Sequence, residues 1–503
     1  MTTELTQRKA INQIARISVI SVVVVLALVQ TNSSAAEKRE RGMKIETVVS
    51  VPAGQRQLFL DDDGIARMEN VKRTLHQPEK KGAVIVGTQT RSAPAWDVAR
   101  QTYLLATLAG CYESKDGLHW TPIKSNRRVD CVVYDATDPN SAHRYKGALH
   151  PDGFVVSPDG ANWKQLDVPG VPSGDEYNFS FDEQEHLFIL TVKHGGPHGR
   201  AVFFSTSRDF RTWTNPELNF HADDLDQKLG RARIERRFAD PTFQQPFYNI
   251  PATYNVDVYN MGVFRYENLY LGLPSLYDQT GKVAKDWPGF VDGFDTPEML
   301  THYRRDGDWS GFHHVQLICS RDLHHWQRLG DRQAFLAPSP LGAGAYDTAC
   351  IIGPSSPVVR GNQLWFYYTG LKQYGGPEPD RDNCAVCLAV LRRDGFISLD
   401  ASEKEGTILT KPFRVTGNKL FVNADALKGE LRVQALDDNR KVLATSAPLN
   451  GNLLRGEVQW QQGDIATLKG QTVSLRFTLR SASFYSYWLE GNHRHGTSLS
   501  ERD

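Results

Sequence analysis

The heptad SRDLHHW, residues 320–326, carries Ser, Asp and Trp at its first, third and seventh positions and follows the mainly apolar run 315–319. Three more heptads share this pattern, and a degenerate fifth copy covers residues 391–398. The four full copies begin at Ser114, Ser157, Ser207 and Ser320 and end at Trp120, Trp163, Trp213 and Trp326. Ser and Asp side chains bond the backbone of turns, and a Trp can cover a hairpin end. Each heptad therefore predicts a turn between two antiparallel strands.

Two further strand-like segments stand upstream of each heptad, as in 176–194 before 199–213. The first three Trp residues are spaced by 43 and 50 residues, and the longer step to Trp326 contains an insertion at roughly 217–255. Self-similarity at this period, with four strands per unit, is typical of a β-propeller. Five units predict five blades. The alternative is a set of unrelated hairpins that share turn chemistry.

The pattern changes after residue 400, where no heptad occurs and apolar and polar residues alternate. Leu431 and Val433 share one strand face, and Leu475 and Phe477 share another. This alternation predicts a β-sandwich. The fold class is therefore all-β, a five-bladed β-propeller followed by a C-terminal β-sandwich. The expected segments are a signal peptide at 1–36, a linker at 37–54, the propeller at 55–401, the sandwich at 402–490 and a disordered tail at 491–503.

The N-terminus has the layout of a secretory signal. Arg8, Lys9 and Arg16 precede the apolar run 17–29, and small residues up to Ala36 follow it. This run of thirteen residues is shorter than the roughly twenty that span a bilayer, which favours cleavage after Ala36 and export without stable membrane association. The alternative is an uncleaved N-terminal membrane anchor.

The composition excludes several classes of partner and cofactor. Lys+Arg and Asp+Glu are balanced at 58 each, so no long-range field favours nucleic acid. Six cysteines are too few to be the main support of so long a chain, although disulfides are possible in an exported protein. Cys384 and Cys387 form a CxxC inside an apparent strand, where residues three apart face opposite sides, so we expect no metal there. No cofactor is expected.

Several stretches carry a resemblance to a known group of enzymes. They are QLFLDD at 57–62, HRYKGAL at 143–149, QLWFYYTG at 363–370 and LRRDGFISLDA at 391–401. Together with the heptads and the C-terminal sandwich, they resemble the clan of glycoside hydrolase families 32 and 43, and in particular an uncharacterised bacterial group related to family 32. The resemblance covers residues 55 to about 490 and implies a five-bladed propeller that acts on glycans.

The chain departs from family 32 at the catalytic motifs. That family carries W-M-N-D-P-N-G, R-D-P and E-C strings, and none of them occurs in this sequence. The nearest string is Ala239-Asp240-Pro241, which lies in the insertion. The family's catalytic residues therefore cannot be carried over by motif, and the search has to start from the fold.

Hydrolysis of a glycosidic bond uses a protonated carboxyl and an ionised carboxylate, and the innermost strands of a propeller bring distant acids to one channel. Counting back from the heptads, these strands should begin near residues 91, 130, 175, 257 and 346. We predict Glu176 as the acid, Asp61 or Asp62 as nucleophile or base, and Asp347 or Asp130 as the stabiliser. Asp97, Asp135, Asp182 and Glu267 fall between first and second strands, where we expect solvated turns. For each acid the alternative is a carboxylate satisfied by backbone amides.

Further side chains near the inner strands are candidates for substrate binding, because carboxylates bond sugar hydroxyls and aromatic faces stack on sugar rings. They are Asp175, Asp257, Tyr177, Tyr346 and Trp96. The sequence lacks a phosphate loop, a G-x-S-x-G elbow and an H-E-x-x-H motif. We expect an exported glycosidase that acts on a furanoside or another polysaccharide-derived glycan. The alternatives are a carbohydrate-binding propeller without catalysis and a cell-surface interaction scaffold.

The assignment of Glu176 generates a direct prediction. Glu176→Gln should abolish the release of reducing sugar and leave glycan binding largely intact, because the amide cannot supply the proton. Reducing-sugar assays and binding measurements on the same variant check it, and unchanged turnover would remove Glu176 from the scheme.

Overall fold

The computed structural model describes residues 48–175, 177–282, 309–342, 344–373 and 382–491. Residues 1–47 and 492–503, which include the expected signal segment and most of the expected tail, lie outside the described residues, as do Glu176, 283–308, Ala343 and 374–381. Strands dominate the described part, and the one α-helix there is α2 (Asp224–Ala239). No helix in these residues is long and apolar enough to cross a bilayer.

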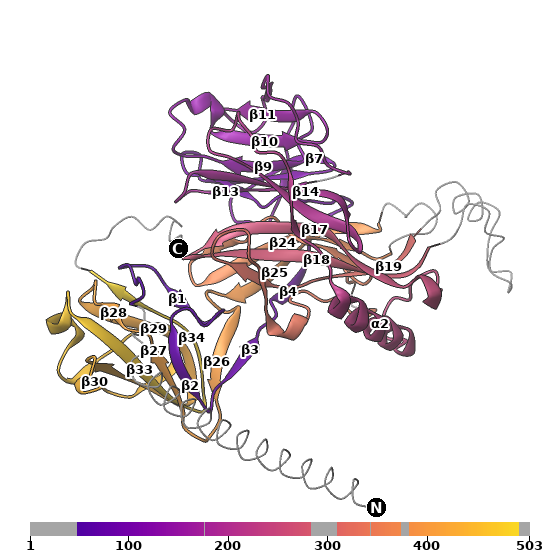
Figure 1. Ribbon diagram of the computed structural model, residues 1–503. Coiled ribbons are helices and arrows are strands. Elements are labelled where there is room, and N and C mark those ends of the chain that lie inside the picture. Colours follow the sequence, from indigo (N-terminus) through magenta and orange to yellow (C-terminus); the bar gives the residue numbers. More distant parts are fainter. Residues whose placement is uncertain (1–47, 176, 283–308, 343, 374–381, 492–503) are drawn as a thin grey trace, which may run out of the picture. The chain divides into compact units, whose positions relative to one another are not determined.

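Five separate antiparallel sheets form the five blades of the predicted propeller (Figure 1). Blades 1 to 3 each have four strands, which follow the order of the chain from the channel outward. Blade 1 consists of β5 (Ala95–Asp97), β6 (Thr102–Thr107), β7 (Gly110–Ser114) and β8 (Thr121–Pro122), and blade 2 of β9 (Cys131–Tyr134), β10 (Tyr145–Leu149), β11 (Gly153–Ser157) and β12 (Lys164–Gln165). Blade 3 consists of β13 (Tyr177–Asp182), β14 (Leu187–Gly196), β15 (Gly199–Ser207) and β16 (Glu217–Phe220).

Blade 4 follows the insertion that carries α2, and blade 5 closes the ring. Blade 4 consists of β17 (Asn255–Tyr266), β18 (Leu269–Lys282), β19 (Trp309–Val315), β20 (Ile318–Ser320) and β21 (Gln327–Arg328). Blade 5 consists of β22 (Cys350–Ile352), β23 (Val358–Arg360), β24 (Gln363–Leu371), β25 (Cys384–Arg392) and, on its outer edge, β4 (Glu79–Val86). The N-terminal strand β4 thus completes the last blade. The innermost strands begin within four residues of the predicted positions.

Five apolar clusters fill the contacts between consecutive blades. Leu104 of blade 1 and Val155 of blade 2 share one cluster, and Tyr103 of blade 1 and Tyr367 of blade 5 share the cluster that closes the ring. The other three clusters join blades 2 and 3, 3 and 4, and 4 and 5. Each blade therefore buries both of its faces, and burial of apolar area is the main stabilising term of the ring.

The four heptads form the predicted turns between third and fourth strands. In the first, Ser114 Oγ donates to Asp116 Oδ1 at 3.1 Å, and Asp116 accepts from the backbone amides of Leu118 and His119 at 2.8 and 2.9 Å. The other three copies repeat these bonds, with Ser-to-Asp distances of 3.0–3.1 Å. The amide donors hold the carboxylates ionised, and the pKa of Asp159 falls to about 2, although burial opposes the shift.

The fourth heptad position has positive φ in every copy, and different residues occupy it. Gly117 and Gly160 have no room for a side chain, because a Cβ there would lie 2.5 Å from Tyr367 Oη and 2.4 Å from a Leu104 methyl group. Phe210 and Leu323 adopt positive φ without glycine and bury their own side chains between blades. The space between neighbouring blades at this position is thus filled either by the side chain of the turn residue or by a side chain of the next blade.

Carboxylates at the turns between first and second strands are buried, so the prediction of solvated turns there is wrong. Tyr145 of blade 2 donates to Asp97 of blade 1 at 3.0 Å, and Tyr270 of blade 4 donates to Asp182 of blade 3 at 2.6 Å. Asp135 pairs with Lys146, 3.3 Å away. Amides of their own turns also bond these carboxylates. The tyrosine partners of Asp97 and Asp182 come from the neighbouring blade, which a turn motif alone does not reveal.

The C-terminal domain is one bent set of twelve strands with its own apolar core. The buried positions include Leu431, Val433, Leu475 and Phe477, as predicted for a sandwich. Its C-terminal strands are β26 (Ile397–Ala401), β27 (Gly406–Thr410), β28 (Phe413–Arg414), β29 (Lys419–Leu436), β30 (Val442–Ser446), β31 (Leu449–Glu457), β32 (Trp460–Gln462), β33 (Thr472–Arg480) and β34 (Ala482–Glu490). Short 3₁₀ turns, at Ser141–His143, Pro251–Thr253, Gly330–Arg332 and Ile465–Leu468, complete the described elements.

Three N-terminal strands belong to this domain and not to the propeller, which corrects the expected boundary at residue 55. β1 (Gln57–Leu58) pairs with β34, β2 (Ile65–Glu69) with β27, and β3 (Lys72–Leu75) with β26. Figure 1 shows these indigo strands among the orange and yellow ones. The first propeller strand is therefore β4.

The six cysteines all lie in the described residues and carry free thiols. Cys384 and Cys387 face different clusters from opposite sides of β25, as the strand period requires. No group of three or more His, Cys, Asp or Glu side chains in the described part of the chain is arranged to hold a metal ion.

Asp394 joins the propeller to the C-terminal domain. Its buried carboxylate accepts from Arg56 at 2.7 Å, from Tyr266 of blade 4 at 2.7 Å, and from Asn423 and Ser486 of the C-terminal domain at 3.1 and 2.6 Å. Burial alone would raise the pKa of Asp394, but the charge of Arg56 and the hydroxyl donors outweigh it and lower the pKa. The fully satisfied carboxylate fixes four segments at one point.

Glu267 lies beside this group and generates a prediction on stability. Burial, and then the negative charge of Asp394, raise the pKa of Glu267 to about 7 from its ordinary 4.5. Because the folded state prefers the protonated form, protonation of Glu267 stabilises the fold. This contribution to the free energy of unfolding, about 2–3 kcal/mol, is complete below pH 4.5 and is lost as the pH rises through 7. Glu267→Gln should therefore lose less thermal stability than the wild type between pH 5.5 and 8.5. Thermal denaturation at both values checks it, with the exposed Glu403→Gln as the matched control, and an equal loss in all three proteins would contradict it.

Candidate functional site

The innermost strands of all five blades begin at the same end of the channel, which we call the strand-start end. Asp130 directly precedes β9, Asp175 lies two residues before β13, and Asp257 is the third residue of β17. Blades 2, 3 and 4 therefore each bring a carboxylate to this end, as the sequence predicted. Glu176, the predicted acid, lies outside the described residues, and its role stays a prediction.

Small polar side chains cross the channel itself. Asn178 Nδ2 donates to the carbonyl of Arg91 at 3.0 Å, and Ser355 Oγ donates to the same oxygen at 2.6 Å. Asn260 Nδ2 donates to Asn178 Oδ1 at 3.0 Å. These bonds link blades 1, 3, 4 and 5, so the channel interior is a buried polar network and not an apolar plug. Sequence reasoning missed this network, although the repeated pair Tyr-Asn at 177–178 and 259–260 was a visible signal.

Asp257 is the most deeply buried of the predicted carboxylates at the strand-start end, with 1% of its surface exposed. Its Oδ2 accepts from the backbone and side chain of Arg200 at 3.1 and 2.9 Å and from Gln279 Nε2 at 2.8 Å. Its Oδ1 has no hydrogen-bond partner among the described residues. Burial raises the pKa of Asp257, and the charge and bonds of Arg200 only partly offset it. One oxygen is thus fixed by three N–H donors, and the other is buried without a hydrogen bond to any described residue.

Two cations and several aromatic rings surround Asp257. Lys193 Nζ lies 2.6 Å from Asp175 Oδ1 and 3.7 Å from the ring centroid of Tyr259. The guanidinium of Arg200 lies 5.2 Å from the ring centroid of Trp309. Cation–π contacts of this kind fix the direction of long basic side chains. The two acids of blades 3 and 4 are therefore held in ordered surroundings.

His313 lies between the rings of Tyr259 and Tyr277, with centroids 4.7 and 4.5 Å away. Burial, and then the positive charges of Arg200 and Lys193, lower the pKa of His313 well below its ordinary value. The imidazole is therefore neutral at physiological pH. It adds a polar but uncharged wall to the site.

Asp130 and Tyr177 occupy the blade 2 and blade 3 part of this end. Asp130 Oδ2 accepts from the backbone amide of His150 at 2.9 Å, and Arg128 lies 3.3 Å from Oδ1. Tyr177 donates to the carbonyl of Leu149 at 2.9 Å and is 3% exposed. Its ring is a core element and leaves no free face for a sugar, contrary to its predicted role in substrate binding.

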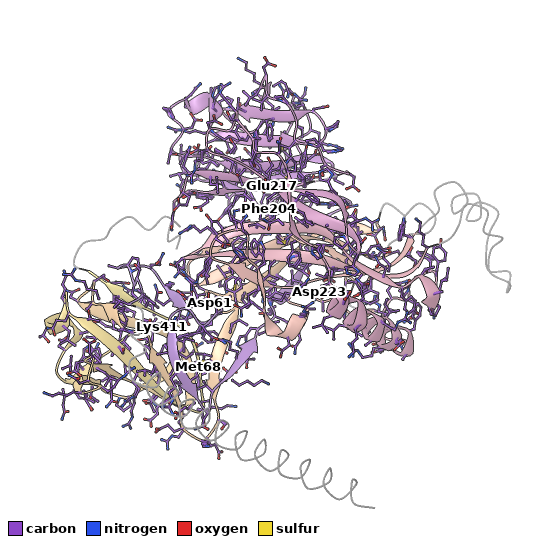
Figure 2. All side chains as sticks on the ribbon, in the orientation of Figure 1. Asp61, Met68, Phe204, Glu217, Asp223 and Lys411 are labelled. Carbon is purple, nitrogen blue, oxygen red and sulfur yellow. The ribbon has the colours of Figure 1, made fainter. Side chains whose placement is uncertain are left out.

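Asp61 and Asp62 do not reach the channel, so the prediction that they serve as nucleophile or base there is wrong. Figure 2 shows Asp61 near Lys411, at the strands of the C-terminal domain. Asp61 accepts from Arg321 at 2.8 and 3.0 Å, in the heptad turn of blade 4, and Asp62 pairs with Arg73. The reason is the strand pairing: residues 57–75 join the C-terminal domain and do not close the ring.

Asp347 precedes β22 by three residues, as predicted, but its carboxylate turns away from the channel. It lies 2.6 Å from Lys80 Nζ of the ring-closing strand and accepts from Tyr368 at 2.9 Å, with 3% of the residue exposed. This buried pair ties β4 to the segment before β22, which is a structural task and corrects the predicted stabilising role.

The remaining aromatic candidates, Trp96 and Tyr346, are both partly exposed. Trp96 packs on Tyr103, with centroids 4.4 Å apart, in the cluster between blades 5 and 1. Tyr346 is partly exposed near the strand-start end, where its hydroxyl bonds Asp382 and Lys372 lies 4.3 Å from its ring centroid. Both side chains are therefore partly accessible, and Lys372 lies over the ring of Tyr346.

No protein-family model and no curated protein matches the chain. Among solved structures, it is similar to an N-acetylgalactosamine deacetylase from F. plautii in complex with blood group B trisaccharide, at 12% identity over 69% of this chain and 96% of that chain, with a TM-score of 0.34. It is also similar to the catalytic domain of a family 62 α-L-arabinofuranosidase from Coprinopsis cinerea, at 13% identity, 63% and 97% coverage and a TM-score of 0.35. A family 32 β-fructofuranosidase from Bombyx mori matches at 9% identity, 82% and 94% coverage and a TM-score of 0.32.

At such identities and TM-scores, these likenesses carry no argument about activity. The five-bladed ring rests on the strand pairing described above, and it is the architecture that the resemblance to the glycoside hydrolase clan implied.

The placement of Asp347 generates a prediction that separates structure from catalysis. Asp347→Asn should lower the free energy of unfolding by about 1–3 kcal/mol, because Lys80 loses its charge partner in a largely buried place, and should leave turnover within about twofold. Urea denaturation of Asp347→Asn, Lys80→Met and the double variant measures the coupling. Unchanged stability with lost turnover would return Asp347 to the catalytic residues.

Proposed function

We propose that this protein is an exported glycoside hydrolase whose active site lies at the strand-start end of the channel. The observation that carries the proposal is Asp257, a buried carboxyl with one oxygen held by three N–H donors and the other without a partner among the described residues. A carboxyl with a raised pKa beside an ion-paired second carboxylate is the arrangement that glycoside hydrolysis uses.

Asp257 acts in this scheme as the proton donor. Its Oδ1 gives a proton to the glycosidic oxygen while the bond from that oxygen to the anomeric carbon breaks. Asp175, paired with Lys193, takes a proton from the attacking water as its oxygen bonds the anomeric carbon, and solvent returns the proton to Asp257. Glu176, adjacent to Asp175, remains the sequence-based candidate for the acid. Asp130 and Tyr346 would contact the substrate.

The proposed substrate is a furanoside or another glycan derived from a polysaccharide, in line with the family resemblance. Export rests on the basic, apolar and small-residue segments up to Ala36, with an N-terminal membrane anchor as the alternative. The aromatic and amide groups near Asp257 and Tyr346 match the hydroxyls and ring faces of a sugar.

A carbohydrate-binding propeller without catalysis is the second candidate. It is favoured by the cations that hold each described acid at this end: Arg200 at Asp257, Lys193 at Asp175 and Arg128 at Asp130. Carboxylates held in this way can serve as acceptors for sugar hydroxyls without transferring a proton.

Asp257→Asn tests the proposal. The amide keeps the size of the side chain but cannot give up a proton, so release of reducing sugar from a panel of neutral and acidic glycans should fall by at least about 100-fold while binding persists. Asp167→Asn, an exposed acid at the edge of blade 2, is the matched control. Wild-type protein that binds glycans but hydrolyses none of the panel would establish the second candidate instead, and full activity of Asp257→Asn would remove Asp257 from the site.

A further inference from the structure

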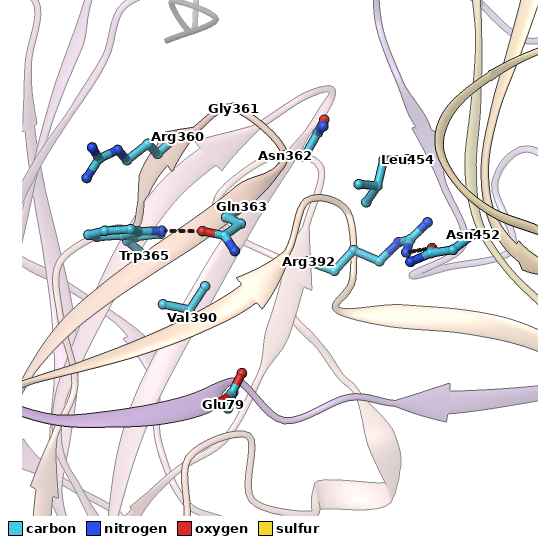
Figure 3. A pocket seen from close by; sticks show the side chains of 10 residues that line it. All are labelled: Glu79, Arg360, Gly361, Asn362, Gln363, Trp365, Val390, Arg392, Asn452 and Leu454. Atoms are coloured by element: carbon cyan, nitrogen blue, oxygen red, sulfur yellow. Dashed lines mark hydrogen bonds between the residues drawn. The ribbon is translucent and has the colours of Figure 1, made fainter. Parts of the chain in front are cut away.

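A pocket of about 530 Å³ lies between blade 5 and the C-terminal domain (Figure 3). Glu79 begins β4, Gln363 begins β24 and Arg392 ends β25, so the pocket sits at the end of the ring opposite the strand-start end. Asn452 and Leu454 of β31 form its other wall. We call it the interdomain groove. It is remote from Asp257 and plays no part in the proposed hydrolysis.

Both arginines of the interdomain groove are already engaged. Arg392 donates to Asn423 Oδ1 at 2.7 Å, to the carbonyl of Leu453 at 3.0 Å and to that of Ala424 at 3.2 Å. Arg360 bonds the carbonyl of Asp116, and its guanidinium lies 4.5 Å from the ring centroid of Trp365. Neither arginine has a free pair of N–H donors for a carboxylate or phosphate, so the groove does not favour an anion.

The other polar groups of the lining are amides and one carboxylate. Trp365 Nε1 donates to Gln363 Oε1 at 2.9 Å, which leaves Gln363 Nε2 as a donor facing the groove. The exposed side chain of Asn362 makes no hydrogen bond to any described residue. Glu79, whose Oε1 lies 2.6 Å from Lys81 Nζ in an exposed ion pair, adds carboxylate acceptors. Donors and acceptors thus stand together around a space that is open to solvent.

The stack of Arg360 on Trp365 gives the groove a flat surface. A guanidinium on an indole is weakly hydrated for a charged group, and a sugar ring can lie against such a surface. Val390 and Leu454 are the other apolar contributions to the lining, which is too little to anchor the large side chains of a peptide. Hydroxyl groups, which both donate and accept, match the mixed amides better.

We propose that the interdomain groove binds an uncharged segment of a glycan chain. Trp365 and Arg360 provide the surface against which a sugar ring lies, and Asn362, Gln363 and Glu79 bond its hydroxyls. A polymer held there raises the effective concentration of the remaining chain around the protein. The groove therefore acts as a holding site for long substrates, and this binding does not depend on whether the channel is catalytic.

Native gel electrophoresis in hydroxyethyl cellulose, arabinoxylan, galactomannan, inulin and polygalacturonate tests the proposal on the full chain. Asp257→Asn serves as the parent, so that no polymer is consumed. At least one neutral polysaccharide should retard the parent, and adding Asn362→Ala with Gln363→Ala should weaken that binding by at least about tenfold. Both positions are exposed, so the fold should persist, and thermal denaturation confirms it.

Trp365→Ala is a second variant, and Gln459→Ala, an exposed amide on the C-terminal domain outside the groove, is the matched control. Equal retardation of the groove variants and the parent would overturn the proposal, as would retardation by polygalacturonate alone or by none of the polymers. The proposed hydrolysis is tested separately, by reducing-sugar release from the wild type. The groove substitutions made in the wild-type chain should leave that release unchanged on short oligosaccharides.

Discussion

The buried carboxylate of Asp394 is the constraint on which the arrangement of the two domains depends. An ionised group at this depth is tolerated only because Arg56 neutralises it and hydroxyl and amide donors occupy its oxygens. Those donors come from the N-terminal segment, blade 4 and the C-terminal domain. If any of them moved away, the charge would lose part of its solvation, so the domains are held at one relative position. The interdomain groove depends on this, because its two walls belong to different domains.

The two ends of the ring are built for different tasks. The strand-start end collects buried titratable groups: burial raises the pKa of Asp257 and lowers the pKa of His313, so both are moved towards the neutral form. The interdomain groove contains mostly uncharged amides and engaged arginines. In the proposed scheme, the strand-start end transfers protons to and from a glycan chain, and the interdomain groove binds another segment of that chain. The polar network of Asn178 and Asn260 separates them within the channel.

Much of the fold could be predicted from sequence because the heptads are local. Ser, Asp and Trp at fixed spacing specify a turn without any distant partner, and counting back from them located the innermost strands within four residues. Strand partners are nonlocal, so residues 57–75 were recognisable as strands but were assigned to the wrong domain, and Asp61 with them. The burial of Asp97 and Asp182 depends on tyrosines of the next blade. The buried ion pair of Asp347 could not be predicted for the same reason, since its partner Lys80 lies far away in sequence.

The pairing of the first strands with the last ones also sets the order of events during biosynthesis. β1 to β4 leave the ribosome first, yet their partners are β25, β26, β27 and β34. Contacts of such long sequence separation form late, because the entropy of closing the intervening chain is lost before they contribute. Neither domain can be completed until translation is nearly finished. A nascent chain of this protein would remain open for most of its synthesis, which would suit the proposed export, since an exported polypeptide is threaded unfolded through a translocation pore.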